Sequence, residues 1–196
     1  MPGYDAPAQE ANPVKILIAG GFGVGKTTLV ETVSEIEPLR TEERLTSAGV
    51  GIDDLDGIES KAVTTVAMDF GRITLTDAQV VLYLFGTPGQ ERFWFMWDDL
   101  LNGALGAIVL VDTRRLDRSF PAVDFFENRG LPFVVGANCF HGEQPYSVEE
   151  IRAALHLREP NTPVLMLDAR SRDDVRGVLL SLLDMLIAQA GVVAPG

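Results

Sequence analysis

The chain has 196 residues, a formal net charge of −12 and 46% hydrophobic residues, values typical of one globular domain that buries a core. The acidic charge argues against nucleic acid as a partner, because non-specific binding depends on Lys and Arg that neutralise phosphates. No apolar run reaches the roughly 18 residues of a membrane span, so we expect no direct membrane insertion.

The sequence pattern divides the chain into three parts. Residues 1–13 have no basic start followed by an apolar stretch, and we expect a disordered tail rather than a signal peptide. Residues 14–190 carry all the periodic segments and are predicted to form one domain, and residues 191–196 are predicted to be a C-terminal tail without a cysteine for prenylation. We therefore expect a cytoplasmic protein whose recruitment to a membrane depends on partners.

The first predicted elements are a strand, Val14–Ala19, then a glycine-rich turn, then an apolar-striped helix that Pro38 ends. The polar segment from Leu39 to Ala62 has no sustained periodicity and is predicted to be a long, functional loop. Its acidic stretch Asp53–Asp56 is interpreted as solvated, because it lacks the Gly and the distal Glu of a calcium loop.

From Val63 onward, strands and helices follow one another regularly. The predicted strands are Val63–Leu75, Val80–Phe85, Ala107–Val111, Phe133–Ala137 and Val164–Leu167. The predicted helices are Ser119–Arg129 closed by Gly130, Ser147–Leu155 opened by a capping box, and a last helix with an apolar stripe from Val175 to Ala190. The first two strands predict a hairpin. The alternation after them predicts an α/β fold, with about six strands in a mostly parallel sheet, one antiparallel edge strand and helices on both faces.

The glycine-rich turn carries a phosphate-binding motif. Residues 20–27, GGFGVGKT, match G-x-x-x-x-G-K-[ST] directly after a strand and before a helix, as a P-loop requires. Backbone N–H groups are expected to point at the phosphates, Lys26 to reach the β- and γ-phosphates, and the Thr27 hydroxyl to bind Mg²⁺. The residues predicted to contact the nucleotide here are Gly21, Phe22, Gly23, Val24, Gly25, Lys26, Thr27 and Thr28.

Two later segments resemble the switch regions of small GTPases. TTVAMDF at 64–70 resembles the switch I pattern T-x-G-x-D-F of Rab-like proteins, which implies that Thr65 binds Mg²⁺ and senses the γ-phosphate; a Thr-rich edge strand is the alternative. GTPGQE at 86–91 resembles the switch II motif D-x-x-G-Q. This second resemblance implies that the Gly89 N–H binds the γ-phosphate and that Gln90 orients the attacking water.

The segments FGTPGQERFWFMWDD, TTVAMDFG and VDTRR, together with the P-loop, resemble bacterial Ras-like small GTPases of the MglA-related group, most of all the conservon (CvnD-like) proteins. The resemblance spans about residues 14–190. It implies a P-loop NTPase of the Ras-like fold that acts as a signalling switch, with GTP or GDP and Mg²⁺ as cofactors. It also implies a Roadblock/LC7-domain protein as partner and an indirect link to a sensor kinase.

The chain departs from the small-GTPase pattern at two positions of the phosphate site. Gly86 stands where most small GTPases have the aspartate that holds Mg²⁺ through water; Asp112, after the next strand, is either a substitute or the cap of the following turn. Phe22 stands beside the γ-phosphate, where many relatives carry a small residue. Its ring either obstructs an arginine finger from a partner or packs against switch II.

The base-reading loop departs further. Asn138-Cys139-Phe140-His141 replaces N-K-x-D, and a neutral His offers one acceptor where Asp accepts two N–H bonds from guanine. An unpaired guanine donor costs about 1–3 kcal/mol, so His141 lowers the expected guanine selectivity unless Glu143 supplies a carboxylate. Asp168-Ala169-Arg170 resembles the S-A-K loop, whose central backbone N–H contacts the guanine oxygen.

An aromatic run, Phe93 to Trp97, follows switch II and cannot all face one side of a helix, so at least one ring is expected to be exposed. Exposed aromatic rings favour a protein partner, with core packing as the alternative.

The sequence is consistent with two predicted functions. The leading prediction is a switch with slow GTP hydrolysis, in which Lys26, Thr27 and Thr65 stabilise charge and Gln90 positions water. The alternative is a degenerate, non-hydrolysing adaptor that binds GDP or no nucleotide. An ATP-using P-loop enzyme is disfavoured because the chain has no lid-like segment and its TPGQE segment suits GTPases.

Overall fold

A computed structural model describes residues 11–37, 39–46, 63–140 and 145–191; of residues 39–46, 63–67 and 91–92 it describes the backbone alone. Most of the two predicted tails and the acidic stretch Asp53–Asp56 lie outside these residues. In the described part of the chain no helix has both the length and the apolar character needed to cross a membrane.

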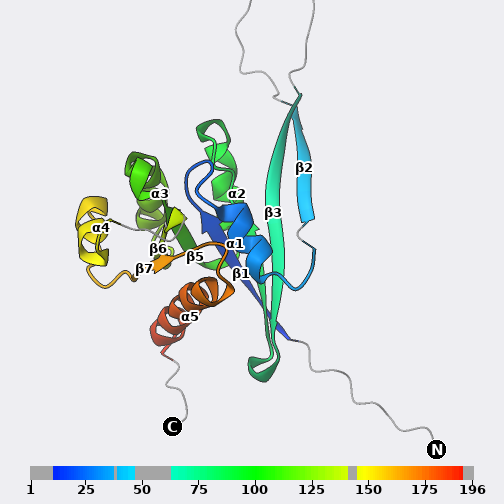
Figure 1. Cartoon of the computed structure of the whole chain (residues 1–196). Helices are drawn as coiled ribbons and strands as arrows, with labels where there is room; N and C mark the ends of the chain where they lie inside the picture. The colour runs from blue at the N-terminus through cyan, green and yellow to red at the C-terminus, as the bar shows by residue number, and fades with distance from the viewer. Residues whose placement is uncertain (1–10, 38, 47–62, 141–144, 192–196) are drawn as a thin grey trace, which may run out of the picture.

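The described elements form one seven-stranded sheet in the order β2-β3-β4-β1-β5-β6-β7 (Figure 1). The parallel part consists of β4 (Val80–Gly86), β1 (Asn12–Ala19), β5 (Ala104–Val111), β6 (Phe133–Asn138) and β7 (Val164–Leu167). β3 (Val63–Leu75) runs antiparallel to both of its neighbours, β4 and β2 (Leu39–Thr46). The predicted fold class is confirmed, a mostly parallel sheet with one antiparallel strand.

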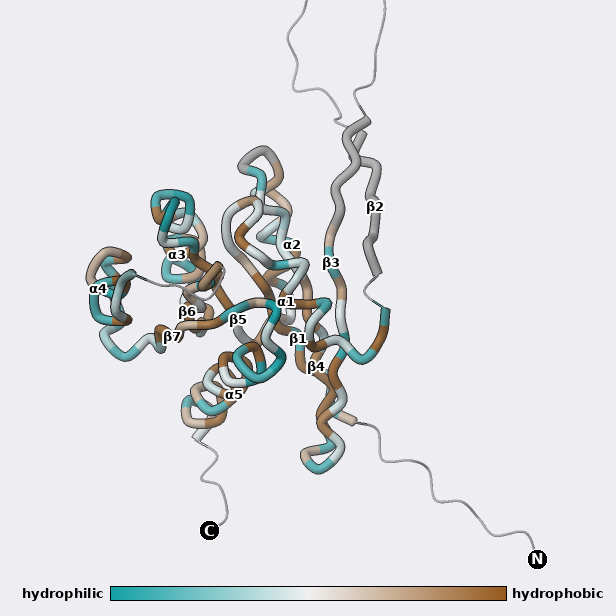
Figure 2. Tube along the Cα trace, viewed as in Figure 1, coloured by the Kyte–Doolittle hydropathy of each residue, from teal (hydrophilic) through white to brown (hydrophobic). Residues whose placement is uncertain are grey.

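Helices cover both faces of the sheet, because successive residues of each central strand point to opposite faces. Ile16 and Ile18 of β1 pack in a core with α1 (Lys26–Val33) and α5 (Arg172–Gln189). Leu17 and Ala19 of the same strand pack in a second core on the other face. The helices of that second face are α2 (Trp97–Leu101), α3 (Phe120–Arg129) and α4 (Val148–Leu155). Figure 2 shows the hydrophobic strands lying between these helices.

Most predicted helix ends are confirmed. Ser147 opens α4 with a capping box in which its side chain and that of Glu150 each accept a backbone N–H. Gly130 ends α3 with φ 64°, a left-handed conformation that favours glycine. The prediction that Pro38 ends the first helix was wrong, since α1 ends at Val33, where Ser34 is already extended. Three short 3₁₀ helices complete the fold: η1 (Thr76–Ala78), η2 (Glu91–Met96) and η3 (Thr113–Ser119).

The prediction of a loop from Leu39 onward was wrong for its first eight residues. They form β2, which pairs with β3 from Leu39 opposite Phe70 to Thr46 opposite Val63. The strand depends on backbone bonds to a partner distant in sequence, and RTEER has no alternation of apolar residues that a pattern could detect. As a result the sheet has seven strands, and β2 rather than the antiparallel β3 lies at its edge.

Candidate nucleotide-binding site

The P-loop connects the carboxyl end of β1 to the amino end of α1. Gly20 and Gly25 have φ angles of 135° and 109°, which side chains rarely allow. A Cβ at Gly25 would also lie 2.6 Å from the Nδ2 atom of Asn138. The loop therefore needs glycine to curl tightly, and it opens the first turn of α1 toward the carboxyl edge of the sheet, where α/β proteins bind phosphates.

One cavity of about 460 Å³ brings most of the predicted phosphate site together. It is lined by Phe22, Gly23, Gly25, Lys26, Thr27, Thr28, Asp69, Thr87, Pro88, Gly89, Gln90 and Phe93. Gly21 and Val24 belong to the same loop and line a second, small hollow together with Arg118 of η3. The P-loop and the TPGQ turn, residues 87–90, thus face a common space although they lie 60 residues apart in the sequence.

Lys26 lines this cavity. Its buried amine donates hydrogen bonds to the carbonyl oxygens of Gly20 and Gly21, each at 2.9 Å. Burial lowers the pKa of Lys26 to about 8, and the negative charge of Asp69 opposes this shift. A Cβ at Gly89 would lie 2.6 Å from the Lys26 amine and 2.9 Å from the backbone nitrogen of Phe22, so glycine lets the turn at 87–90 approach the P-loop backbone this closely.

Asp69 is a candidate site residue that the sequence pattern did not single out. The Thr27 hydroxyl donates a 2.6 Å hydrogen bond to its carboxylate. A Cβ at Gly86 would lie 3.1 Å from both the Cβ and the Oδ2 of Asp69. The side chain of Asp69 therefore occupies, from β3, the space beside Thr27 where a side chain at position 86 would reach from β4.

The residues around Thr27 fit a magnesium ion. A hydroxyl and a carboxylate are the hard oxygen ligands that Mg²⁺ prefers. The Thr87 hydroxyl beside them is buried and, within the described part of the chain, has no hydrogen-bond partner. Buried orphan hydroxyls are uncommon and mark places where water or a ligand completes the site.

The interpretation of Asp112 as a cap is confirmed, and its role as a substitute metal ligand is not. Its side chain accepts a hydrogen bond from the Arg114 backbone and forms ion pairs with Arg114 and Arg115. The Arg114 side-chain hydrogen bond is the main cause of its lowered pKa. Asp69, and not Asp112, contacts Thr27.

Two further phosphate-site residues differ in how far the structure describes them. Thr65 lies in β3 opposite Arg44, and the structure describes its backbone alone. It stands four residues before Asp69, which at about 3.3 Å per residue is about 13 Å along the strand; its part in metal binding stays a prediction. Phe22 is 63% exposed and lines the phosphate cavity together with Phe93.

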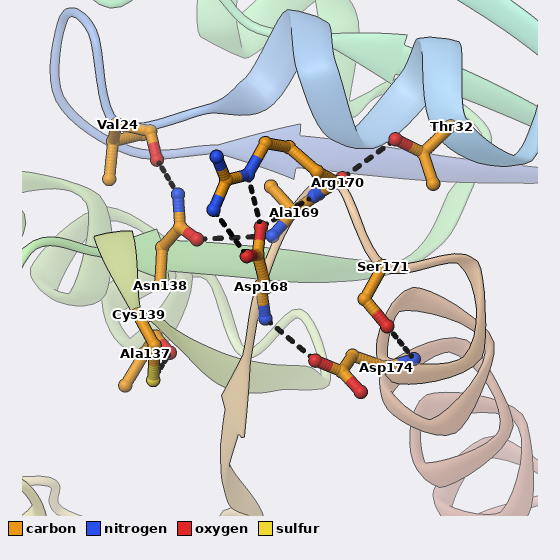
Figure 3. Close-up of polar contacts among 10 residues, drawn as sticks. All are labelled: Val24, Thr32, Ala137, Asn138, Cys139, Asp168, Ala169, Arg170, Ser171 and Asp174. Atoms are coloured by element: carbon orange, nitrogen blue, oxygen red, sulfur yellow. Dashed lines mark hydrogen bonds and ion pairs between the residues drawn. The ribbon is translucent and has the colours of Figure 1, made fainter. Parts of the chain in front are cut away.

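The base-reading end is organised around Asn138 (Figure 3). Its buried amide donates to the Val24 oxygen at 2.9 Å and accepts the Ala169 N–H at 3.1 Å, so it ties β6 to the P-loop and to the loop after β7. The Ala169 N–H expected to face a guanine oxygen is therefore engaged by Asn138. Beside the Ala169 N–H, Asp168 and Arg170 form a bidentate ion pair. His141 and Glu143 lie outside the described residues.

The aromatic run after the TPGQ turn divides as expected. Phe93 and Trp97 are buried, and Phe95 is 63% exposed, which confirms that at least one ring faces solvent. The Trp97 indole donates a 3.1 Å hydrogen bond to the Pro88 oxygen. The segment thus holds the TPGQ turn on its inner side and presents an aromatic ring on its outer side.

A P-loop after the first strand, a carboxylate beside its threonine and a TPGQ turn on the neighbouring strand define a P-loop NTPase with the fold of a small GTPase. A profile of the family described as "Conserved hypothetical ATP binding protein" matches residues 18–189, and the chain belongs to that family. The uncharacterized protein MJ1339 of Methanocaldococcus jannaschii is 31% identical over 127 residues, which cover 64% of this chain and 69% of the relative.

Rab proteins and G domains of solved structure are also similar. Rab-32C of Dictyostelium discoideum is 26% identical over 72% of this chain, and human Rab-7b is 31% identical over 62%. The matches span 58% and 52% of those two proteins. The G domain of the T. maritima FeoB iron transporter superposes with a TM-score of 0.61 at 15% identity, covering 88% of this chain and 98% of that domain. These similarities support a nucleotide-binding, GTPase-like switch.

Proposed function

We propose that the chain is a guanine-nucleotide-binding molecular switch with slow GTP hydrolysis, and that residues 14–190 form its G domain. The observation that carries the proposal is the single cavity shared by the P-loop, Asp69 and the TPGQ turn. In it Lys26 neutralises the phosphates, the Gly89 N–H senses the γ-phosphate and Gln90, exposed at the rim, positions the attacking water.

In this proposal Mg²⁺ is held by Thr27 and Asp69, and Thr65 becomes a further ligand only after the switch I segment moves toward the phosphates. The 2.6 Å contact between the Thr27 hydroxyl and the Asp69 carboxylate supports it. When bound, the metal neutralises charge on the phosphates. Asp69 supplies the carboxylate that Gly86 lacks, so metal binding does not require an aspartate at position 86.

We propose guanine as the preferred base. Asn138, Asp168, Ala169 and Arg170 meet at the place where small GTPases read guanine, and the similar protein ypt2 of Schizosaccharomyces pombe is named a GTP-binding protein. The family description names ATP instead. A direct competition between the two bases is therefore the first experiment.

The experiment identifies the nucleotide retained by freshly purified protein and then titrates emptied protein with GDP, GTP and ATP in Mg²⁺. Selective binding of GDP and GTP at micromolar affinity or tighter supports the switch. Selective binding of ATP would show that adenine, not guanine, is the preferred base. If no nucleotide binds, the alternative function, a non-hydrolysing adaptor, is supported instead. Single-turnover phosphate release separates hydrolysis from binding: Gln90→Leu and Thr65→Ala should slow it, whereas an adaptor shows only the background rate in every variant.

The cellular part of the proposal is a cytoplasmic role in bacterial signalling, as in the MglA-related conservon group, with a Roadblock/LC7-type partner linked to a sensor kinase and to any membrane recruitment. Two exposed aromatic rings support a partner surface beside the nucleotide: Phe22 and Phe95, each 63% exposed. A Roadblock/LC7 protein should bind one nucleotide state more tightly than the other. Phe95→Ser should weaken that binding without changing nucleotide affinity.

A further inference from the structure

A buried carboxylate fixes the side chain of Arg114 at the carboxyl end of β5. Asp112 is 4% exposed and accepts three hydrogen bonds from Arg114: one from its backbone at 3.0 Å, one from Nε at 2.8 Å and one from Nη2 at 2.9 Å. The Arg115 guanidinium lies 3.5 Å from the same carboxylate. Two parallel bonds to a carboxylate set the plane of a guanidinium, so the position and tilt of the Arg114 head group are determined.

The fixed guanidinium lies on the ring of Phe140. Its Cζ atom is 3.8 Å from the ring centroid, a cation–π geometry. Phe140 directly follows Asn138 and Cys139, the start of the base-reading loop. Asn138 is tied to Val24 and Ala169, and the Cys139 N–H donates to the Leu167 oxygen at 2.7 Å. The loop is thus held by the P-loop and β7 on one side and by Arg114 on the other.

We infer that Arg114, oriented by Asp112, is a positioning residue for the base-binding half of the nucleotide site. This inference rests on the proposed nucleotide-binding function. Arg114 acts through Phe140, which it holds against the loop that begins at Asn138. It therefore contributes to affinity for the base and leaves the phosphate half, built from Lys26 and Thr27 on other elements, unaffected.

The space beside Phe140 would allow its ring to move if Arg114 did not hold it. A cavity of about 700 Å³ opens beside the ring, lined by Asp112, Thr113, Arg114, Asn138, Phe140, Pro145 and Tyr146. A ring released by Arg114 has room to move into that space, and only the bonds of Asn138 and Cys139 then hold the start of the loop. Losing the guanidinium should therefore loosen the base-reading loop rather than merely expose one more aromatic face.

The chain contains a matched control for the stack itself. Arg129 lies 3.8 Å over the ring of Phe125 and pairs with Asp98, so it combines the same cation–π and carboxylate contacts at the opposite end of α3. Arg129→Gln removes an equivalent stack away from the nucleotide site. Comparing it with Arg114→Gln separates a general loss of surface packing from an effect on the base.

The experiment is calorimetric titration of the full chain with GDP and with inorganic tripolyphosphate, both in Mg²⁺, which report the whole site and its phosphate half. Arg114→Gln should raise the Kd for GDP about fivefold to thirtyfold, the range of a cation–π contact plus a loosened loop. The Kd for tripolyphosphate should stay within about twofold. Phe140→Leu should have the same effect, the double variant no larger one, and Phe140→Tyr, which keeps the stack, little effect.

The outcomes separate this inference from the proposed function. If the wild type binds neither ligand, the proposed function fails and the inference fails with it. If the wild type binds GDP and Arg114→Gln binds it equally well, or weakens both ligands alike, the inference alone is overturned. An equal effect of Arg129→Gln on GDP also overturns it. Thermal melts identify a variant that fails to fold, and the Phe140→Leu and Phe140→Tyr pair then decides the question.

Discussion

At the scale of single residues, the carboxylate beside the Thr27 hydroxyl comes from β3. Asp69 supplies it, and Gly86 on the neighbouring strand β4 has no side chain to share that space. We predict that Asp69→Asn raises the Mg²⁺ concentration needed for half-maximal retention of GDP by about 10- to 100-fold, as expected when a metal site loses an oriented carboxylate. Asp77→Asn, an exposed change at the other end of the β3–β4 hairpin, is the matched control.

The two positions should also compensate for each other. Gly86→Asp alone places a second carboxylate against Asp69, with its Cβ only 3.1 Å from that side chain, and should destabilise the protein. Combining it with Asp69→Gly removes the clash and returns one carboxylate to the site. We expect the double variant to need less Mg²⁺ for GDP retention than Asp69→Gly alone. Independent, additive effects of the two changes would contradict the shared position.

Lys26 gives a prediction in pH. Its pKa is lowered to about 8 by burial, and only the ammonium form attracts phosphates. The Kd for GDP should therefore rise about tenfold between pH 7 and pH 9. Lys26→Met should bind weakly with a smaller pH dependence, which isolates the lysine from titration of the ligand.

The stability of the empty protein should change in the opposite direction. Because the pKa of Lys26 falls from 10.5 to about 8 on folding, the unfolded chain binds more protons between these two values. The burial cost of the charge is present below pH 8 and is relieved as the pH rises from 8 to 10.5. Urea denaturation of wild type and Lys26→Met should show this gain only in the wild type.

At the scale of elements, the sequence predicted what is encoded locally. The P-loop turn, the β3–β4 hairpin and the capping box of α4 each depend on neighbouring residues, and each is confirmed. β2 was missed because its pairing partner is distant and its residues are charged. The sequence pattern also did not predict that Asp69 lies beside Thr27 and Gly86, for a related reason. The β3–β4 register pairs Phe70 with Phe85, which sets Asp69 against Gly86, and the motif alone carries no information on neighbouring strands.

The segment after the TPGQ turn makes a prediction of its own. The buried Trp97 indole donates to the Pro88 oxygen and so joins α2 to the turn that carries Gly89 and Gln90. Trp97→Phe leaves that oxygen unpaired and a small cavity, and should lower the free energy of unfolding by about 2 kcal/mol. Trp94→Phe, which changes a half-buried ring nearby, should cost less than about 1 kcal/mol in the same urea denaturation experiment.

At the scale of the whole molecule, the proposed nucleotide joins three parts of the sheet edge. The P-loop follows β1, the TPGQ turn follows β4, and Asn138 and Ala169 follow β6 and β7. These strands are not all adjacent, so a ligand that contacts all three parts links segments from Gly20 to Arg170. Its binding should therefore stabilise the fold as a unit.

That linkage gives the last prediction. A ligand that binds only the folded protein should add about 2.7 kcal/mol to the free energy of unfolding at 100 times its Kd. Urea denaturation with saturating GDP and Mg²⁺ should show this gain, and chelating the metal with EDTA should remove most of it in the wild type. In Asp69→Asn the gain should be small even before chelation, because the carboxylate beside Thr27 has lost its charge. A gain that is equal in both proteins and insensitive to EDTA would mean that the nucleotide binds without the metal, and that Asp69 serves only to hold Thr27.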